Sequence, residues 1–313
     1  MNSPPEVSVV VPCYNEEQVL ARMIARLQAV CRDVCQVHEI ILVDDGSADG
    51  TWPIIQRAAA SDPRVRGLKL SRNFGHQAAL TAGLRAARGA EIFIIDADLQ
   101  DPPELLATMH ARLAEGYNVV YGQRLSRKGE TWFKLATAHC FYRLLSFLSD
   151  VEIPENTGDF RLMDRRAVDA LLALPESNRF IRGMVSWIGF RQLAVGYHRQ
   201  ERAAGATKYS LGRMIRFSLD AITSSSVRPL RLAALVGAAM LLVAFLIGVW
   251  VLFNWAIGGT IHGWSSIMMI ILVIGGFQIL LLGVIGEYIG RLFIESKGRP
   301  LYFIHEETGQ HPS

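Results

Sequence analysis

Residues 92–101 read Ile-Phe-Ile-Ile-Asp-Ala-Asp-Leu-Gln-Asp, an apolar run that passes directly into a group of carboxylates. A short, strongly apolar run of this kind is typical of a strand buried on both faces. In an extended chain, residues two apart point the same way, so Asp96 and Asp98 are expected to reach one cation, with Gln100 next on that face. Oxygen ligands suit Mg²⁺ or Mn²⁺, which also bridges substrate phosphates. The stretch therefore predicts a buried strand that ends at a divalent-cation site.

Similar apolar runs alternate with helical stretches over residues 1–226. This alternation predicts an α/β fold with a mainly parallel sheet and helices on both faces. Ligands of such sheets bind beyond the carboxyl ends of the strands. The expected strands are residues 7–11, 39–43, 65–70, 92–95 and 119–121, and the expected helices are 19–30, 77–87, 103–115 and one that starts near residue 50.

Two more polar clusters follow expected strands. Pro-Cys-Tyr-Asn-Glu-Glu occupies residues 12–17, and Asp-Asp-Gly-Ser-Ala-Asp-Gly-Thr occupies residues 44–51. Three acidic clusters at one sheet edge imply a site that handles a cation and phosphates. The chain has no Gly-x-Gly-x-x-Gly after its first strand and no Gly-x-x-x-x-Gly-Lys-Ser/Thr loop, which argues against the dinucleotide-binding and P-loop folds.

A long uncharged stretch marks the C-terminal part of the chain. There is no Asp, Glu, Lys or Arg from Leu232 to Gly286. About 20 apolar residues cross a bilayer core, so two transmembrane spans are expected, at 232–257 and 264–286. Basic residues lie outside both spans and none lies in the turn between them, so the large domain and both termini are predicted to be cytoplasmic, at the inner membrane. These basic residues are Arg228, Arg231, Arg291, Lys297 and Arg299.

Composition argues against several other classes. The formal net charge of +3 is too mild to indicate a nucleic-acid partner. The expected spans contain no charged residue that would mark a transport pathway. The four cysteines lack a second pair at metal-binding spacing, so they are expected to be buried thiols in a reducing compartment.

The motifs together resemble a known family. Residues 9–17, 43–51 and 96–104 are similar to the corresponding segments of family 2 inverting glycosyltransferases with the GT-A fold. Residues 158–163 and 202–209, together with the membrane pair, narrow the resemblance to polyprenyl-phosphate glycosyltransferases. Within that group the chain resembles the bactoprenol glucosyltransferases, which residues 297–302 also resemble, with dolichol-phosphate mannose synthase as a more distant relative.

The resemblance implies roles for particular residues on the donor side. A nucleotide-sugar would bind through its nucleoside and diphosphate, and a divalent cation would sit on the diphosphate. The implied nucleotide-sugar residues are Pro12, Tyr14, Glu16, Asp45 and Asp96, and the implied metal ligands are Asp96, Asp98 and Gln100.

On the acceptor side, the resemblance implies that basic residues bind the lipid phosphate, namely Arg124, Arg161, Arg202 and Lys208. Asp98 and Asp159 are the implied catalytic residues, with Asp159 near the anomeric carbon as a base. A phosphate with a second pKa of about 6 is already largely ionised at neutral pH, so little deprotonation is needed. Asp159 is therefore expected to act as a base, to position the acceptor, or to serve a structural role through Arg161.

Three domains are expected. Residues 1–226 form the catalytic domain, 227–290 the transmembrane hairpin and 291–313 a cytoplasmic tail. Within the first, residues 132–148 and 208–226 mix aromatic and basic side chains, which suits helices lying in the membrane interface. Core packing is the alternative for both segments. Small residues such as Gly275 in the second span are compatible with a homo-oligomer.

The expected reaction is transfer of glucose from UDP-glucose to polyprenyl (undecaprenyl) phosphate. GDP-mannose or another UDP-sugar is the alternative donor. A processive polysaccharide synthase is disfavoured because Gln-x-x-Arg-Trp is absent. A non-catalytic membrane scaffold that binds nucleotide-sugar remains the alternative from a different class.

The carboxylates at the cation site generate the first prediction. Asp96→Ala and Asp98→Ala should each abolish sugar transfer, because the cation on the diphosphate would lose a ligand. Expression and membrane insertion should persist, as judged by membrane fractionation. Full turnover in both variants and in the presence of a chelator would contradict the predicted site.

Overall fold

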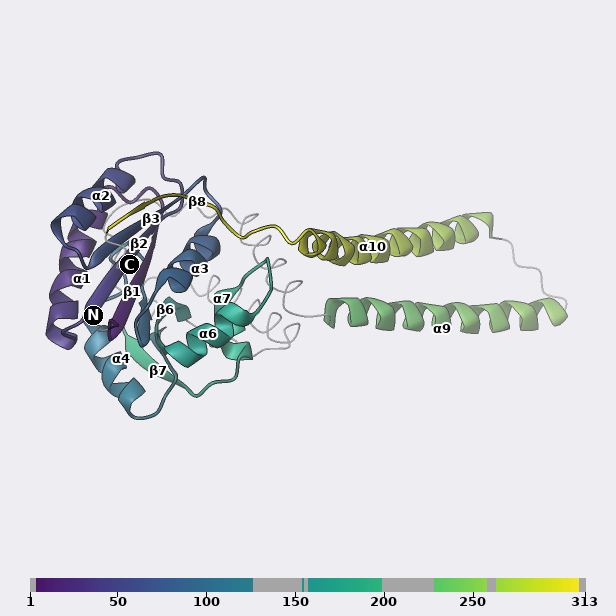
Figure 1. Cartoon of the computed structure of the whole chain (residues 1–313). Helices are drawn as coiled ribbons and strands as arrows, with labels where there is room; N and C mark the ends of the chain where they lie inside the picture. Colours follow the sequence, from purple (N-terminus) through teal and green to yellow (C-terminus); the bar gives the residue numbers. More distant parts are fainter. Residues whose placement is uncertain (1–3, 126–153, 155–156, 199–227, 258–262, 310–313) are drawn as a thin grey trace. The chain divides into compact units, whose positions relative to one another are not determined.

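The computed structural model describes residues 4–125, 154, 157–198, 228–257 and 263–309 (Figure 1). These residues belong to two compact units. One unit contains the β-sheet, including a strand from the C-terminal end of the chain, and the other contains two long helices.

The first unit is organised around an eight-stranded sheet with the order β7-β5-β6-β4-β1-β2-β3-β8. Strands β6 and β8 run antiparallel to their neighbours, and the other pairings are parallel. The predicted mainly parallel sheet is therefore confirmed. In chain order the strands are β1 (Val7–Cys13), β2 (His38–Asp44), β3 (Val65–Leu70), β4 (Glu91–Ile94), β5 (Val119–Arg124), β6 (Thr157–Asp164), β7 (Gln192–Tyr197) and β8 (Ile304–Thr308).

Helices cover both faces of the sheet. Every residue of β1 is buried, and successive side chains enter opposite core clusters: Val9 and Val11 join one, and Val10 joins the other. This division follows from the two-residue period of a strand. The first cluster includes α1 (Leu20–Val34), α2 (Thr51–Ser61) and α4 (Leu105–Ala114), and the second includes α3 (His76–Ala86), α6 (Arg165–Ala173) and α7 (Ile181–Trp187).

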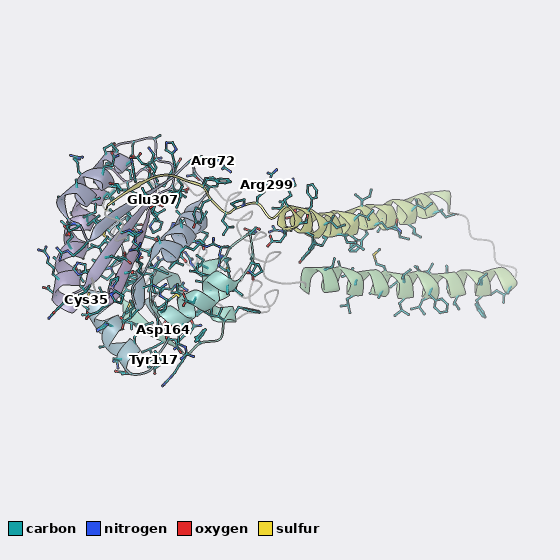
Figure 2. All side chains as sticks on the ribbon, in the orientation of Figure 1. Cys35, Arg72, Tyr117, Asp164, Arg299 and Glu307 are labelled. Carbon is teal, nitrogen blue, oxygen red and sulfur yellow. The ribbon has the colours of Figure 1, made fainter. Side chains whose placement is uncertain are left out.

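Strand β8 is a feature that the sequence did not predict. Residues 291–313 were expected to be a tail, but β8 pairs antiparallel with β3 at the edge of the sheet. Glu306 accepts hydrogen bonds from Nε1 of Trp52 at 3.1 Å and from Nε2 of Gln56 at 2.9 Å, which ties the strand to α2. The neighbouring Glu307 is labelled in Figure 2.

The second unit contains α9 (Arg228–Ala256) and α10 (Trp264–Ser296). Both are long and apolar enough to cross a membrane. Helix α10 continues ten residues beyond the predicted end of the span at residue 286. An ion pair between Arg291 and Glu287 at 2.9 Å, four residues apart, supports the added turns. The first charged residue, Glu287, thus marks the end of the uncharged stretch, while helix α10 continues to Ser296.

The link between β8 and α2 generates a stability prediction. Glu306→Ala should lower the free energy of unfolding by about 1–2 kcal/mol, because the buried indole N–H of Trp52 loses its acceptor. Thermal unfolding of the full chain in detergent measures the change. Glu306→Gln is the matched control, since its amide oxygen still accepts from Trp52. An equal loss in both variants would show that the carboxylate charge, rather than the indole hydrogen bond, matters.

Candidate active site

The candidate site lies at the carboxyl edge of the parallel strands. Strand β4 ends at Ile94, and Asp96 follows two residues later. Strand β6 runs the other way, with Arg161 opposite Ile94, so Asp159 near its start reaches the same edge. The topology therefore brings Asp96 and Asp159 together, although they are 63 residues apart in the sequence.

His76 lies between these two carboxylates. Its Nε2 is 3.2 Å from Oδ2 of Asp159 and 3.6 Å from Oδ1 of Asp96. It is the first residue of α3, and its side chain is 42% exposed. Sequence reasoning missed His76. The available signal was its position immediately after a loop that follows the third strand, at the same edge as the acidic clusters.

Asp159 is surrounded by cationic and amide groups. Its side chain is 2% exposed and accepts hydrogen bonds from Nε of Arg182 at 3.0 Å and Nε2 of Gln77 at 3.1 Å. Burial by itself raises the pKa of Asp159, but Arg182, His76 and Arg161 together hold that pKa well below its usual range. A carboxylate in this environment is a weak base, which favours a positioning role over proton abstraction.

The two carboxylates of the predicted cation site have different surroundings. Oδ1 of Asp96 is buried and has no hydrogen-bond partner among the described residues. Burial raises the pKa of Asp96 to about 6; His76 opposes this shift, and the nearby carboxylates Asp159, Asp101 and Asp98 add to it. Asp98 is half-buried, and its Oδ1 accepts from the backbone N–H of Gln100 at 3.1 Å.

These residues fit a divalent cation that is completed by substrate. No group of three His, Cys, Asp or Glu side chains within the described ranges forms a cage by itself. Mg²⁺ is commonly held by one or two carboxylates, with phosphate oxygens and water completing its shell. Oδ1 of Asp96 makes no hydrogen bond and has only the 3.6 Å contact with His76, so it is a suitable ligand, because a cation would offset the crowding of negative charge around it.

Two adjacent aspartates at the end of β2 differ in their hydrogen bonding. Both oxygens of Asp45 are used within the protein, since they accept from the backbone N–H groups of Phe74 at 2.7 Å and Gly75 at 2.9 Å. Asp44 accepts from the N–H of Ser47 at 3.0 Å through Oδ1, whereas its Oδ2 is buried without a hydrogen-bond partner in the described chain. The assignment of ligand binding to Asp45 stays a prediction, and Oδ2 of Asp44 is a further oxygen available to a ligand donor.

The loop after β1 is held against the loop after β2. The N–H of Asn15 donates to Ser47 at 2.9 Å, and the N–H of Glu16 donates to Oγ1 of Thr51 at 2.8 Å. Pro12, near the end of β1, is buried, and Tyr14 in the loop is 48% exposed at the same edge. The structure therefore places Pro12, Tyr14 and Glu16 beside the end of β2, where they were predicted to line a nucleoside pocket.

Two of the predicted phosphate-binding arginines, Arg161 and Arg124, differ in burial and in their hydrogen-bond partners. Arg161 is 4% exposed, and its guanidinium donates to the backbone oxygens of Gly158 at 2.9 Å and Asp159 at 3.3 Å. Arg124 is 25% exposed and donates to the hydroxyl of Tyr197 at 3.2 Å. A Cβ built on Gly158 would lie 3.0 Å from Nη2 of Arg124, so this arginine reaches the start of β6.

The remaining predicted groups lie outside the described residues. These are Arg202, Lys208 and the two segments 132–148 and 208–226. Among the described residues, Arg182 is a functional candidate that the sequence did not reveal. Its side chain is 38% exposed while it is paired with the buried Asp159.

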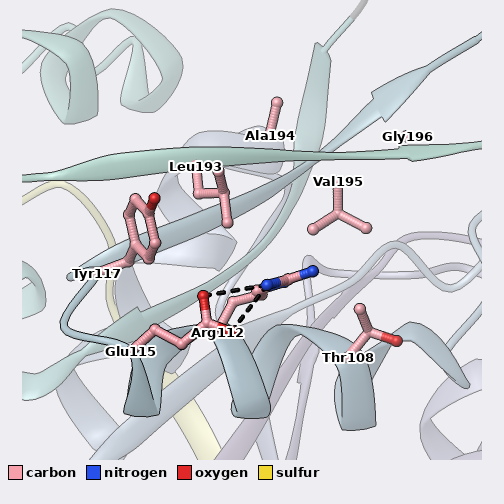
Figure 3. A pocket seen from close by; sticks show the side chains of 8 residues that line it. All are labelled: Thr108, Arg112, Glu115, Tyr117, Leu193, Ala194, Val195 and Gly196. Atoms are coloured by element: carbon pink, nitrogen blue, oxygen red, sulfur yellow. Dashed lines mark hydrogen bonds and ion pairs between the residues drawn. The ribbon is translucent and has the colours of Figure 1, made fainter.

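A separate cavity of about 400 Å³ lies between α4 and β7 (Figure 3). Arg112 and Glu115 form an ion pair at 2.7 Å in its wall, and β7 contributes the opposite side. Within the part of the chain that the structure describes, no predicted site residue lines this cavity. The candidate site is therefore the polar edge formed by the strand ends.

Comparison with known families covers both parts of the chain. A model described as glycosyl transferase family 2 matches residues 8–172, which is more than half of the chain. A second model, described as the GtrB C-terminal hairpin, matches residues 228–292, the region of α9 and α10.

Similar individual proteins extend over nearly the full length. The glycosyltransferase YkcC of Bacillus subtilis (strain 168) is 50% identical over 305 residues, covering 97% of this chain and 94% of the relative. A bactoprenol glucosyl transferase of Shigella phage SfV is 39% identical, covering 96% of this chain and 99% of the relative. A solved structure of glucosyl-3-phosphoglycerate synthase from Mycobacterium tuberculosis, with Mn²⁺, uridine-diphosphate-glucose and phosphoglyceric acid, is 20% identical, with a TM-score of 0.46 and coverage of 70% of this chain and 78% of that chain.

The contrast between the two aspartates of β2 generates a prediction. Asp45→Ala should lower the free energy of unfolding by about 2 kcal/mol, because two backbone N–H groups lose their acceptor. Asp44→Asn should cost much less, since its remaining oxygen still accepts from Ser47. Urea titration of the full chain measures both changes. Equal losses would contradict the division of roles between these residues.

Proposed function

The chain belongs to glycosyl transferase family 2, and from this premise we propose that it transfers glucose from UDP-glucose to polyprenyl phosphate, with inversion, at the cytoplasmic face of the inner membrane. Its mainly parallel sheet with helices on both faces is the GT-A fold that the motifs implied. The observation that carries the choice of acceptor is the similarity to a bactoprenol glucosyl transferase, which covers 96% of this chain.

On the donor side, Asp96 and Asp98 would hold a divalent cation, with Gln100 beside them. Such a cation neutralises the charge on the departing nucleoside diphosphate when it is bound. Pro12, Tyr14, Glu16 and Asp45 are proposed to shape the nucleoside pocket, with Asp44 adding a direct acceptor for a base N–H group. The unpartnered Oδ2 of Asp44 supports that addition.

On the acceptor side, an oxygen of the lipid phosphate would attack the anomeric carbon of the sugar. The bond from that carbon to the donor diphosphate breaks, and its electron pair leaves with the nucleoside diphosphate. Because the attacking phosphate is already largely ionised, this step needs no strong base. The lowered pKa of Asp159 supports a role in orienting cationic groups rather than in accepting a proton.

Positive charge is required where two anionic substrates meet. Arg182 and His76, both oriented by Asp159 and partly exposed, are proposed to face the acceptor phosphate. Arg124 reaches the start of the same strand, β6, and would complete this side. Arg202 and Lys208 are proposed to join them from outside the described residues, whereas Arg161 would contribute indirectly through the backbone at Gly158.

The membrane arrangement is supported by the path of the chain. The sheet precedes α9, and β8 rejoins the same sheet after α10. An even number of membrane crossings between them is therefore needed, which two spanning helices satisfy. Basic residues outside the two apolar stretches support an orientation with the sheet on the cytoplasmic side.

A direct assay tests the proposed function. Purified protein would be incubated with undecaprenyl phosphate, Mn²⁺ and a panel of radiolabelled nucleotide-sugars, and the products separated by lipid extraction. UDP-glucose should give a labelled lipid that releases glucose on mild acid treatment. Labelling only from GDP-mannose or from another UDP-sugar would show that UDP-glucose is not the donor. Equal transfer to a water-soluble alcohol without lipid would contradict the proposal that the acceptor is a lipid phosphate.

Arg182 generates a separate prediction. Arg182→Ala should raise the KM for polyprenyl phosphate on the order of 10- to 100-fold, because a charge-assisted contact to phosphate is lost, while the donor KM changes little. Arg182→Lys should restore part of the loss. Arg166→Ala, which removes an exposed arginine from α6, is the control and should leave both constants unchanged. An unchanged acceptor KM in Arg182→Ala would contradict this assignment.

A further inference from the structure

The residues that follow α10 contact a loop of the candidate site. We use the name return segment for residues 301–308, which include β8, and β3–α3 loop for residues 71–75. Both belong to the same compact unit. Arg72 of the loop and Glu307 of the return segment are labelled in Figure 2.

Phe303 makes the contact between the two. Its ring lies 6.2 Å from the ring of Phe74, centroid to centroid, in a tilted arrangement. Its backbone oxygen accepts from the N–H of Ser71 at 2.9 Å. The Phe303 side chain is 56% exposed, so it contributes little to the core and its contact with the loop is its main described interaction.

The return segment is anchored on both sides of Phe303. Tyr302 packs against the core cluster that Phe74 also joins. On the other side, Ile304 begins β8 and pairs with Leu70, the last residue of β3. The backbone of Phe303 is therefore held beside Ser71, the first residue of the β3–α3 loop.

The same loop is also held at the end of β2. Asp45 accepts from the N–H groups of Phe74 and Gly75, and Gly75 has a φ of 99°, a conformation that favours glycine. A Cβ on Gly46 would lie 2.5 Å from the backbone carbon of Arg72, so the turn after β2 packs directly on the loop. The loop is thus supported by the turn after β2 and by the return segment, in addition to the packing of Phe74 on the core cluster.

The loop leads straight into His76. Because His76 is the next residue after Gly75, its distances to Asp96 and Asp159 depend on where the loop backbone lies. A side chain 3.2 Å from one carboxylate and 3.6 Å from another tolerates only a small displacement before one contact is lost.

We propose that Phe303 is a positioning residue: by packing on Phe74 it holds the β3–α3 loop so that His76 stays between the two carboxylates of the site. The active site is then completed by a residue that lies beyond both apolar helices in the chain. The link to catalysis rests on the proposed function, whereas the link to His76 does not.

Hydrogen–deuterium exchange of the full chain tests the structural part. Phe303→Ala should speed exchange in peptides covering residues 71–76 about three- to tenfold, the range expected when an aromatic pair is lost. His305→Ala, an exposed neighbour in β8, is the matched control and should leave this exchange unchanged. Adding Phe303→Ala to Phe74→Ala should change the exchange little further, because Phe74→Ala already removes the contact with Phe303 together with the Phe74 contacts to the core and to Arg72.

Two further readouts separate positioning from general stability. The imidazole NMR signal of His76, assigned with His76→Gln, should shift in Phe303→Ala and return in Phe303→Tyr, which keeps the ring. The kcat for sugar transfer should fall by a similar three- to tenfold factor and recover in Phe303→Tyr, with the melting temperature nearly unchanged.

The outcomes are distinct. Unchanged exchange and an unshifted His76 signal in Phe303→Ala would overturn the proposal, whatever the transfer activity. A shifted His76 signal with unchanged kcat would overturn its catalytic part. If the wild-type chain transfers no sugar, the proposed function fails, while the exchange and NMR results still decide whether Phe303 positions His76.

Discussion

Crowding of negative charge at the carboxyl edge of the sheet is the constraint on which the rest of the site depends. Asp96 and Asp159 reach this edge from strands that run in opposite directions, and His76 lies between them. The protein offsets the charge of Asp159 internally, with Arg182, Gln77 and His76. It leaves an oxygen of Asp96 without a hydrogen bond, which is the arrangement expected where an external cation completes the neutralisation.

The sequence predicted the central strands from their largely apolar runs, such as 7–11, and the runs at 39–43 and 92–95 are directly followed by acidic residues. Strand β6 was not among the expected strands, and its antiparallel direction depends on tertiary contacts rather than on local pattern. Strand β8, Ile-His-Glu-Glu-Thr, was missed because it is short, polar and mostly exposed. Its pairing depends on the free edge of β3, which is more than two hundred positions earlier in the chain.

The site shows the same limits at the level of single residues. Asp96 and Asp98 were predicted as cation ligands because they directly follow a buried strand. Asp44 and Asp45 are adjacent, so the sequence alone did not reveal which one faces the loop and which one keeps a buried oxygen without a partner. Arg182 lies on a short helix far from any acidic motif, and only the fold brings it to Asp159.

The place of β8 in the sheet has a consequence for biosynthesis. During translation, β1 to β7 leave the ribosome before the apolar helices do, but residues 304–308 emerge after both. The eighth strand can therefore join the sheet only after α9 and α10 have been translated. It also requires residues 304–308 to lie on the same side of the membrane as β3. In the proposed membrane arrangement, a chain with one helix uninserted would leave residues 304–308 on the opposite side of the bilayer from β3. The open edge of β3 would then be exposed to quality-control proteases and chaperones.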